Sequence, residues 1–138
     1  MAIQQGKTNT FSTGLMNGVY NFTTGSFKIA LYTGSASLGP DTAAYTSANE
    51  VVATGYTAGG EALTVSVTPT SANNVSYVSF SNVTWTAALT ARGALIYQNG
   101  GSNPTVCVLD FGSDKISTAT FVVQFPTAGS TDAIIRIT

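Results

Sequence analysis

Phe27-Lys28-Ile29-Ala30-Leu31-Tyr32-Thr33 is the stretch of sequence that decides the fold. In an extended chain, Phe27, Ile29 and Leu31 fall on one face, because successive side chains point to opposite sides. Branched and aromatic residues in such a run, followed by turn residues, are typical of a β-strand. We therefore expect a strand over residues 27–33 whose apolar face is turned toward a core.

Six further stretches have the same character and are separated by turn residues: 62–68, 77–86, 93–97, 105–111, 120–125 and 133–137. Within 77–86 the apolar positions change parity after Phe80, which predicts a bulge or bend near Ser81 and Asn82. The Gly-rich segment 98–104 predicts a hairpin between the strands that flank it. The expected fold is all-β: a single antiparallel sandwich or jelly-roll-like domain of about seven or eight strands, with under about 15% helix.

The strand pattern also predicts which residues form the core. The expected buried side chains are Phe27, Ile29, Leu31, Leu63, Val65, Val78, Phe80, Trp85, Leu95, Val108, Phe121, Val123, Phe125 and Ile135.

Two segments lack strand character. Residues 34–60 form a long loop rich in turn residues, in which Ala43–Val52 has room for one helical turn, and loops of this length are usually functional or structured in their own right. Residues 1–24 are expected to form an extended N-terminal arm with at most one helical turn, because Gly14 and Gly18 disfavour a longer helix. The arm precedes a domain at residues 25–138, and it packs either on that domain or on a neighbouring subunit.

Charged residues are scarce, at 8% of the chain with a net charge of −1, against about 25% in typical domains. A weakly charged surface is poorly protected from self-association, which indicates a surface covered by a partner and a homo-oligomer; a neutral, hydroxyl-rich surface without a partner is the alternative. The five basic residues are scattered singly, so we do not expect nucleic acid binding. The apolar runs are too short for a membrane-spanning helix, and the N-terminus lacks the pattern of a signal peptide, so we expect synthesis in a cytoplasm.

The residues of common catalytic sites are largely missing. The chain has no histidine, which removes the Ser-His-Asp and Cys-His arrangements, and its one cysteine, Cys107, sits in an apolar run that predicts a buried, inert thiol. Asp110 and Asp114 flank a turn, where aspartate commonly caps the backbone. We therefore expect no enzymatic activity, no metal site and no cofactor.

Aromatic and apolar residues outside the strands are the candidates for binding. Residues 2–24 carry large apolar side chains among Gly, Asn and Thr, a composition that gains more by ordering against a partner than by folding alone. Tyrosines of the long loop are candidates for exposed contact with a protein or a sugar. The expected assembly interface is formed by Phe11, Leu15, Met16, Tyr20, Tyr45 and Tyr56.

An ordered set of short motifs resembles a known family. The set is Phe27–Thr33, Asp41–Thr46, Asn49–Val51, Gly55–Gly60, Ala91–Tyr97 and Val108–Gly112. In this order the motifs resemble a family of small structural proteins of tailed-bacteriophage virions. The resemblance covers roughly residues 25–138 and implies a component of the phage particle.

From this resemblance we expect a capsid decoration or cement protein that binds other virion proteins, such as the major capsid protein or tail proteins. Two alternatives remain open at this point. One is a tail, neck or fibre-attachment component of the virion, and the other is a carbohydrate-binding module used for host adsorption.

Overall fold

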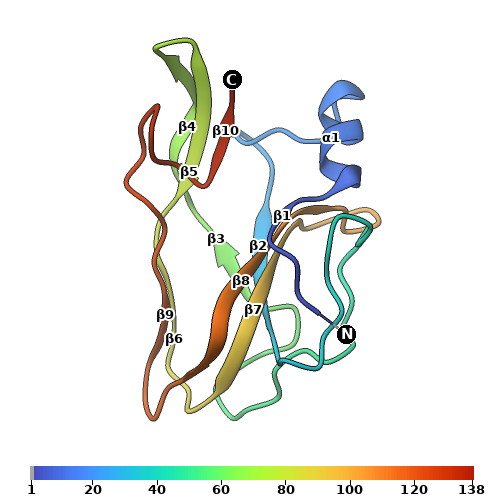
Figure 1. Cartoon of the computed structure of the whole chain (residues 1–138), viewed down its shortest axis with the longest axis vertical. Helices are drawn as coiled ribbons and strands as arrows, with labels where there is room; N and C mark the ends of the chain where they lie inside the picture. Colours follow the sequence, from blue (N-terminus) through green and yellow to red (C-terminus); the bar gives the residue numbers. More distant parts are fainter. Residues whose placement is uncertain (1) are drawn as a thin grey trace.

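A computed structural model describes residues 2–138 of the chain, which form ten strands and one helix (Figure 1). The elements follow the order β1 (Gly6–Lys7), α1 (Asn9–Met16), β2 (Phe27–Tyr32), β3 (Glu61–Leu63), β4 (Val65–Ala72), β5 (Val75–Phe80), β6 (Val83–Trp85), β7 (Thr90–Gln98), β8 (Thr105–Ile116), β9 (Phe121–Val123) and β10 (Ile135–Ile137). Strands account for 44% of the chain and helix for 6%. The prediction of an all-β, antiparallel domain with little helix is confirmed.

The strands of residues 2–138 belong to three antiparallel sheets. The largest has the order β1-β8-β7-β2-β3, a second has the order β10-β5-β4, and β6 pairs with β9 alone. Apolar side chains of β2 pack with those of β5, β6 and β9 to form the main core. The two smaller sheets therefore cover one face of the large sheet (Figure 1).

The opposite face of the large sheet is covered by the long loop. Ala36 and Leu38 of the loop are buried against Ala30, Leu95 and Val108. Because both faces of β2 are covered, Ala30 and Tyr32 are as fully buried as Ile29 and Leu31 on the main core side. The expected helical turn within residues 43–52 does not form, since this part of the loop instead makes isolated bridges to Pro104 and Tyr32.

Two expected strands are each divided in two. Residues 62–68 become the end of β3 and the start of β4, and residues 77–86 become β5 and β6. The interruption after Phe80 confirms the predicted bend, because here the chain passes from one small sheet to the other. The side chain of Asn82 holds this bend by accepting a hydrogen bond of 2.8 Å from the backbone N–H of Phe125.

The predicted hairpin and most of the predicted core are present. β7 and β8 pair with Tyr97 opposite Thr105, and the Gly-rich segment between them forms the turn. The expected core residues are buried except Val65, Phe125 and Ile135, which are partly buried and pack against the core. Val65 and Ile135 belong to the two edge strands of the sheet β10-β5-β4, where one side of the strand has no neighbour.

The N-terminal segment is part of the domain instead of a separate arm. β1 pairs with β8, and α1 follows it with Phe11 buried in the main core. The Phe22 ring stacks on Phe27 of β2, with ring centres 4.6 Å apart. The sequence suggested a boundary at residue 24 between an arm and a domain. The packing shows no such boundary, because aromatic residues on both sides of residue 24 share one core.

Candidate assembly groove

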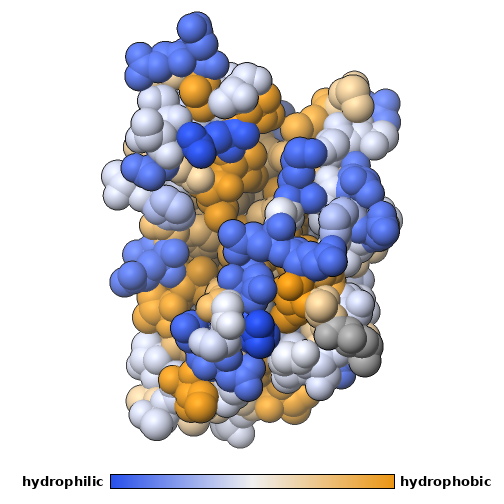
Figure 2. Space-filling model, in the orientation of Figure 1, coloured by the Kyte–Doolittle hydropathy of each residue, from blue (hydrophilic) through white to orange (hydrophobic). Residues whose placement is uncertain are grey.

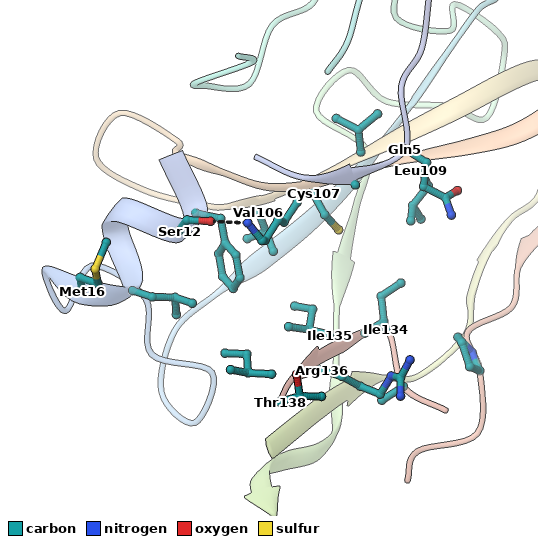
Figure 3. A pocket seen from close by; sticks show the side chains of 18 residues that line it. Gln5, Ser12, Met16, Val106, Cys107, Leu109, Ile134, Ile135, Arg136 and Thr138 are labelled. Atoms are coloured by element: carbon teal, nitrogen blue, oxygen red, sulfur yellow. Dashed lines mark hydrogen bonds between the residues drawn. The ribbon is translucent and has the colours of Figure 1, made fainter. Parts of the chain in front are cut away.

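An apolar groove lies between α1, the β1–β8 pair and β10. Its volume is about 700 Å³, and it continues into a smaller hollow of about 290 Å³ beside β5. Figure 2 shows apolar residues gathered in the hollow between the part of the surface formed by α1 and the part formed by β4, β5 and β10. Figure 3 shows Val106, Cys107 and Leu109 on one side of the groove and Ile134 and Ile135 on the other.

Four of the six residues predicted for the interface line these hollows. Phe11 and Leu15 line both, Met16 lines the larger one, and Tyr20 lines the smaller one. Met16 is 82% exposed and Leu15 is 36% exposed, whereas Phe11 and Tyr20 are buried. Both rings pack in the domain's own core and form the floor of the groove. The prediction that Phe11 and Tyr20 face a neighbouring subunit is therefore wrong in this fold.

Local contacts explain why the helix forms at this place. The side chain of Thr8 caps the helix by accepting a hydrogen bond of 3.1 Å from the N–H of Phe11, a role that threonine commonly fills. Gly14 lies against the ring of Tyr20, where a Cβ atom would clash, and Gly18 adopts a positive φ of 71° just after the helix ends. The two glycines thus allow the close packing and the termination of α1 that residues with a Cβ atom would disfavour.

Tyr20, which follows α1 in the chain, connects this segment to the large sheet. Its hydroxyl donates a hydrogen bond of 2.5 Å to the carbonyl oxygen of Thr105, at the start of β8. Burial of the ring raises the pKa of the Tyr20 hydroxyl to about 12. The base of the groove is therefore fixed by hydrogen bonds and by aromatic packing together.

The opposite wall of the groove was not identified from the sequence. Ile134 and the strand residues Ile135 and Ile137 come from the C-terminal segment, more than a hundred residues from α1. The apolar pattern of residues 133–137 predicted a strand there, but nothing in the pattern indicated that its neighbour across the groove would be the N-terminal helix.

The charged side chains that line the groove are both basic. Lys7 and Arg136 belong to the lining, and the lining residues include neither Asp nor Glu. The Lys7 ammonium donates to the Ser12 hydroxyl at 2.9 Å, and the Arg136 guanidinium donates to the carbonyl oxygen of Ser130 at 3.2 Å. Cys107 also lines the groove, and burial raises the pKa of its thiol to about 12, so the thiol is neutral at ordinary pH.

The other two predicted interface residues lie around the buried carboxylate of Glu50. The Tyr56 hydroxyl and the Gly59 N–H donate to Glu50 Oε1 at 2.7 and 2.8 Å, and the Tyr45 hydroxyl donates to Oε2 at 2.6 Å. Tyr45 is partly buried and stacks on Tyr97, with ring centres 4.9 Å apart. Burial, together with the hydrogen bond to Glu50, raises the pKa of Tyr45.

The prediction that Tyr56 is exposed for contact is wrong, because it is 9% exposed and its ring packs near Trp85. Its hydroxyl also accepts a hydrogen bond from the N–H of Leu31. Tyr45 and Tyr56 therefore hold the long loop in place, and they do not form the exposed aromatic platform on which the carbohydrate-binding alternative rested.

The predicted turn between Asp110 and Asp114 does not form, because both residues lie within β8, where the register of pairing with β7 shifts between Asp110 and Lys115. Asp110 still caps the local backbone, as aspartate commonly does. Its carboxylate accepts from the N–H of Gly112 at 2.9 Å and pairs with Arg92 at 3.3 Å. These two contacts, the backbone one first, lower the pKa of Asp110.

Within residues 2–138 there is no cluster of three or more His, Cys, Asp or Glu side chains able to hold a metal ion. In the same part of the chain, no helix has the length and apolar character needed to cross a membrane.

Comparisons of this chain with protein-family models, with curated proteins and with solved structures find no match. The fold itself defines an all-β domain with an apolar groove at the junction of its N- and C-terminal segments.

Proposed function

We propose that this protein is a structural component of a tailed-bacteriophage virion, a decoration or cement protein that docks on the head through the groove between α1 and β10. The resemblance of its ordered motifs to small virion proteins supports this role. The low charge of the chain supports it as well, since closely spaced copies on a particle repel one another little.

The groove is the observation that carries the proposal. Soluble monomers rarely expose large contiguous apolar patches, and such patches commonly mark interaction sites. Here the exposed side chains of Met16, Leu15 and Ile137 rim an open apolar hollow, at 82%, 36% and 52% exposure. Covering them with a partner removes this apolar surface from water, which is the main favourable term in protein association.

The test uses the phage that encodes this chain, with its gene carrying Met16→Asp. The new carboxylate adds charge at the rim of the groove without disturbing the core, because Met16 is exposed. We expect the wild-type protein on the head in particle images and at least about tenfold fewer copies of the variant in purified particles, which requires an affinity at least about tenfold lower.

The matched control is Val52→Asp, which places the same charge on a 96% exposed side chain in the long loop, away from the groove. This variant should be incorporated at the wild-type copy number. Absence of the wild-type protein from purified particles would refute the virion role. If particle images place the protein on the tail or neck, the decoration role is refuted in favour of a tail, neck or fibre-attachment component.

A further inference from the structure

We propose that the groove binds an extended peptide segment of a partner protein, and that this segment pairs with the free edge of β10. The segment has alternating apolar side chains and acidic flanking residues. This inference rests on the proposed assembly function and names the chemistry of the segment that the groove binds.

The first observation is that two sheet edges line the same groove. β1 is the last strand of the five-stranded sheet, and β10 is the last strand of the sheet β10-β5-β4. Residues of both, Gly6 and Lys7 on one side and Ile135–Ile137 on the other, line the larger hollow. An edge strand offers unpaired backbone N–H and C=O groups, which are a template for pairing with another strand.

The second observation is the apolar character of the space between these edges. Ile135 and Ile137 lie two residues apart on β10 and line both hollows together with Phe11 and Leu15. In strand addition, main-chain hydrogen bonds give affinity, and pockets for alternate side chains give specificity. A strand laid along β10 would direct every second side chain toward this apolar lining.

The third observation is charge. Lys7 and Arg136 lie on different sheets at the groove, both are exposed, and the lining contains neither Asp nor Glu. A segment with acidic residues at its ends meets opposite charge there, whereas a basic segment meets like charge. These two basic side chains therefore favour an acidic segment over a basic one.

The experiment measures binding of labelled synthetic peptides to the purified full chain by fluorescence anisotropy. The probe is a peptide of about six alternating valine and threonine residues, a typical strand length, flanked by aspartates. A second peptide replaces the aspartates with lysines, and a third carries N-methyl groups on alternate residues, which block the backbone N–H donors. We expect the first to bind at least about tenfold more tightly than either of the others.

Variants locate the binding site. Ile137→Asp should abolish binding of the acidic peptide, and the double variant Lys7→Glu, Arg136→Glu should reverse the preference between the acidic and basic peptides. Val52→Asp should bind like the wild type. The proposal would be overturned if all three peptides bound equally or if none bound. It would also be overturned if Val52→Asp weakened peptide binding as much as Ile137→Asp does.

Sedimentation of the chain without peptide tests the other occupant, a second copy. A dimer that Ile137→Asp dissociates would assign the groove to self-association and overturn the proposal as well. The results separate this inference from the proposed function. If Met16→Asp is lost from particles but the wild-type protein binds no peptide, only the proposed strand addition is refuted. If the protein binds the peptide but is absent from particles, only the virion role is refuted.

Discussion

The hydroxyl of Tyr56 donates a hydrogen bond to the carboxylate of Glu50, and both residues are buried. Because the same hydroxyl accepts from the N–H of Leu31 in β2, this pair joins the long loop to strand β2 of the large sheet. The carboxylate has three donors in all, since Tyr45 and Gly59 contribute the other two. A buried charge with such partners is stable, but removal of the charge leaves the donors unpaired.

Glu50→Ala is therefore expected to lower the free energy of unfolding by on the order of 3 kcal/mol, because buried donors without a partner cost about 1–3 kcal/mol each and solvent can satisfy some of them. Glu50→Gln retains a planar acceptor of similar shape and should cost about 1 kcal/mol. Urea unfolding of the two variants measures the difference. Equal losses would show that side-chain volume, and not hydrogen bonding, holds the loop.

Gly60 allows the loop to approach β2. Its φ is 81°, and a Cβ atom at this position would overlap the carbonyl oxygen of Ile29. Gly60→Ala should therefore cost more than about 3 kcal/mol or prevent folding, since the backbone itself must move. Gly101→Ala is the matched control, because Gly101 also has a positive φ but has open space around it, and it should cost about 1–2 kcal/mol. Similar losses for both, measured by thermal unfolding, would contradict the proposed contact.

Trp85 is 1% exposed and packs between Tyr56 and Phe121. Trp85→Ala should cost about 3–5 kcal/mol, as large aromatic deletions do. The indole N–H is buried and has no hydrogen-bond partner within residues 2–138, so Trp85→Phe removes no hydrogen bond and should cost clearly less. A loss below about 1 kcal/mol for Trp85→Ala in denaturant titrations would mean that the ring is not in the core.

Alkaline pH should destabilise the fold. Burial raises the pKa of Tyr20 to about 12 and also raises that of Tyr32. Unfolded tyrosines lose their proton near pH 10, while the folded state keeps it, so the unfolded state binds fewer protons and the free energy of unfolding falls as pH rises above about 10. Urea midpoints at about pH 8, 10 and 11 measure the slope, which Tyr32→Phe should reduce. A midpoint that stays constant through this range would refute the burial of these hydroxyls.

The sequence predicted those features of the fold that depend on local pattern. The alternation at Phe27, Ile29 and Leu31 indicated strand β2, and the change of parity after Phe80 indicated the bend that divides β5 from β6. Features that depend on contacts between residues far apart in the sequence were not predicted. The same glycine, Gly14, that disfavours a helix in isolation is required beside the ring of Tyr20, and no local signal reveals that contact.

The candidate site was predicted in part for the same reason. Leu15 and Met16 were identified because they are apolar residues in a polar segment, and both lie at the groove. Tyr56 was assigned to the surface because loops are usually exposed, but its hydroxyl is paired with Glu50, six residues away. The wall formed by Ile135 and Ile137 follows from the topology of the sheets, which strand patterns alone do not determine.

Removal of residues 2–22 tests whether the N-terminal segment is an arm or a part of the domain. The deletion takes away Phe11, Tyr20 and Phe22, whose rings pack with one another and with Phe27. Because burial of each aromatic side chain contributes several kcal/mol and whole domains are stable by only about 5–15 kcal/mol, the truncated chain should not fold. Met16→Ser serves as the control, since an 82% exposed side chain contributes little to stability. A truncated chain with wild-type circular dichroism and a cooperative unfolding transition would show that residues 25–138 fold alone, and the aromatic contacts across residue 24 would then be dispensable.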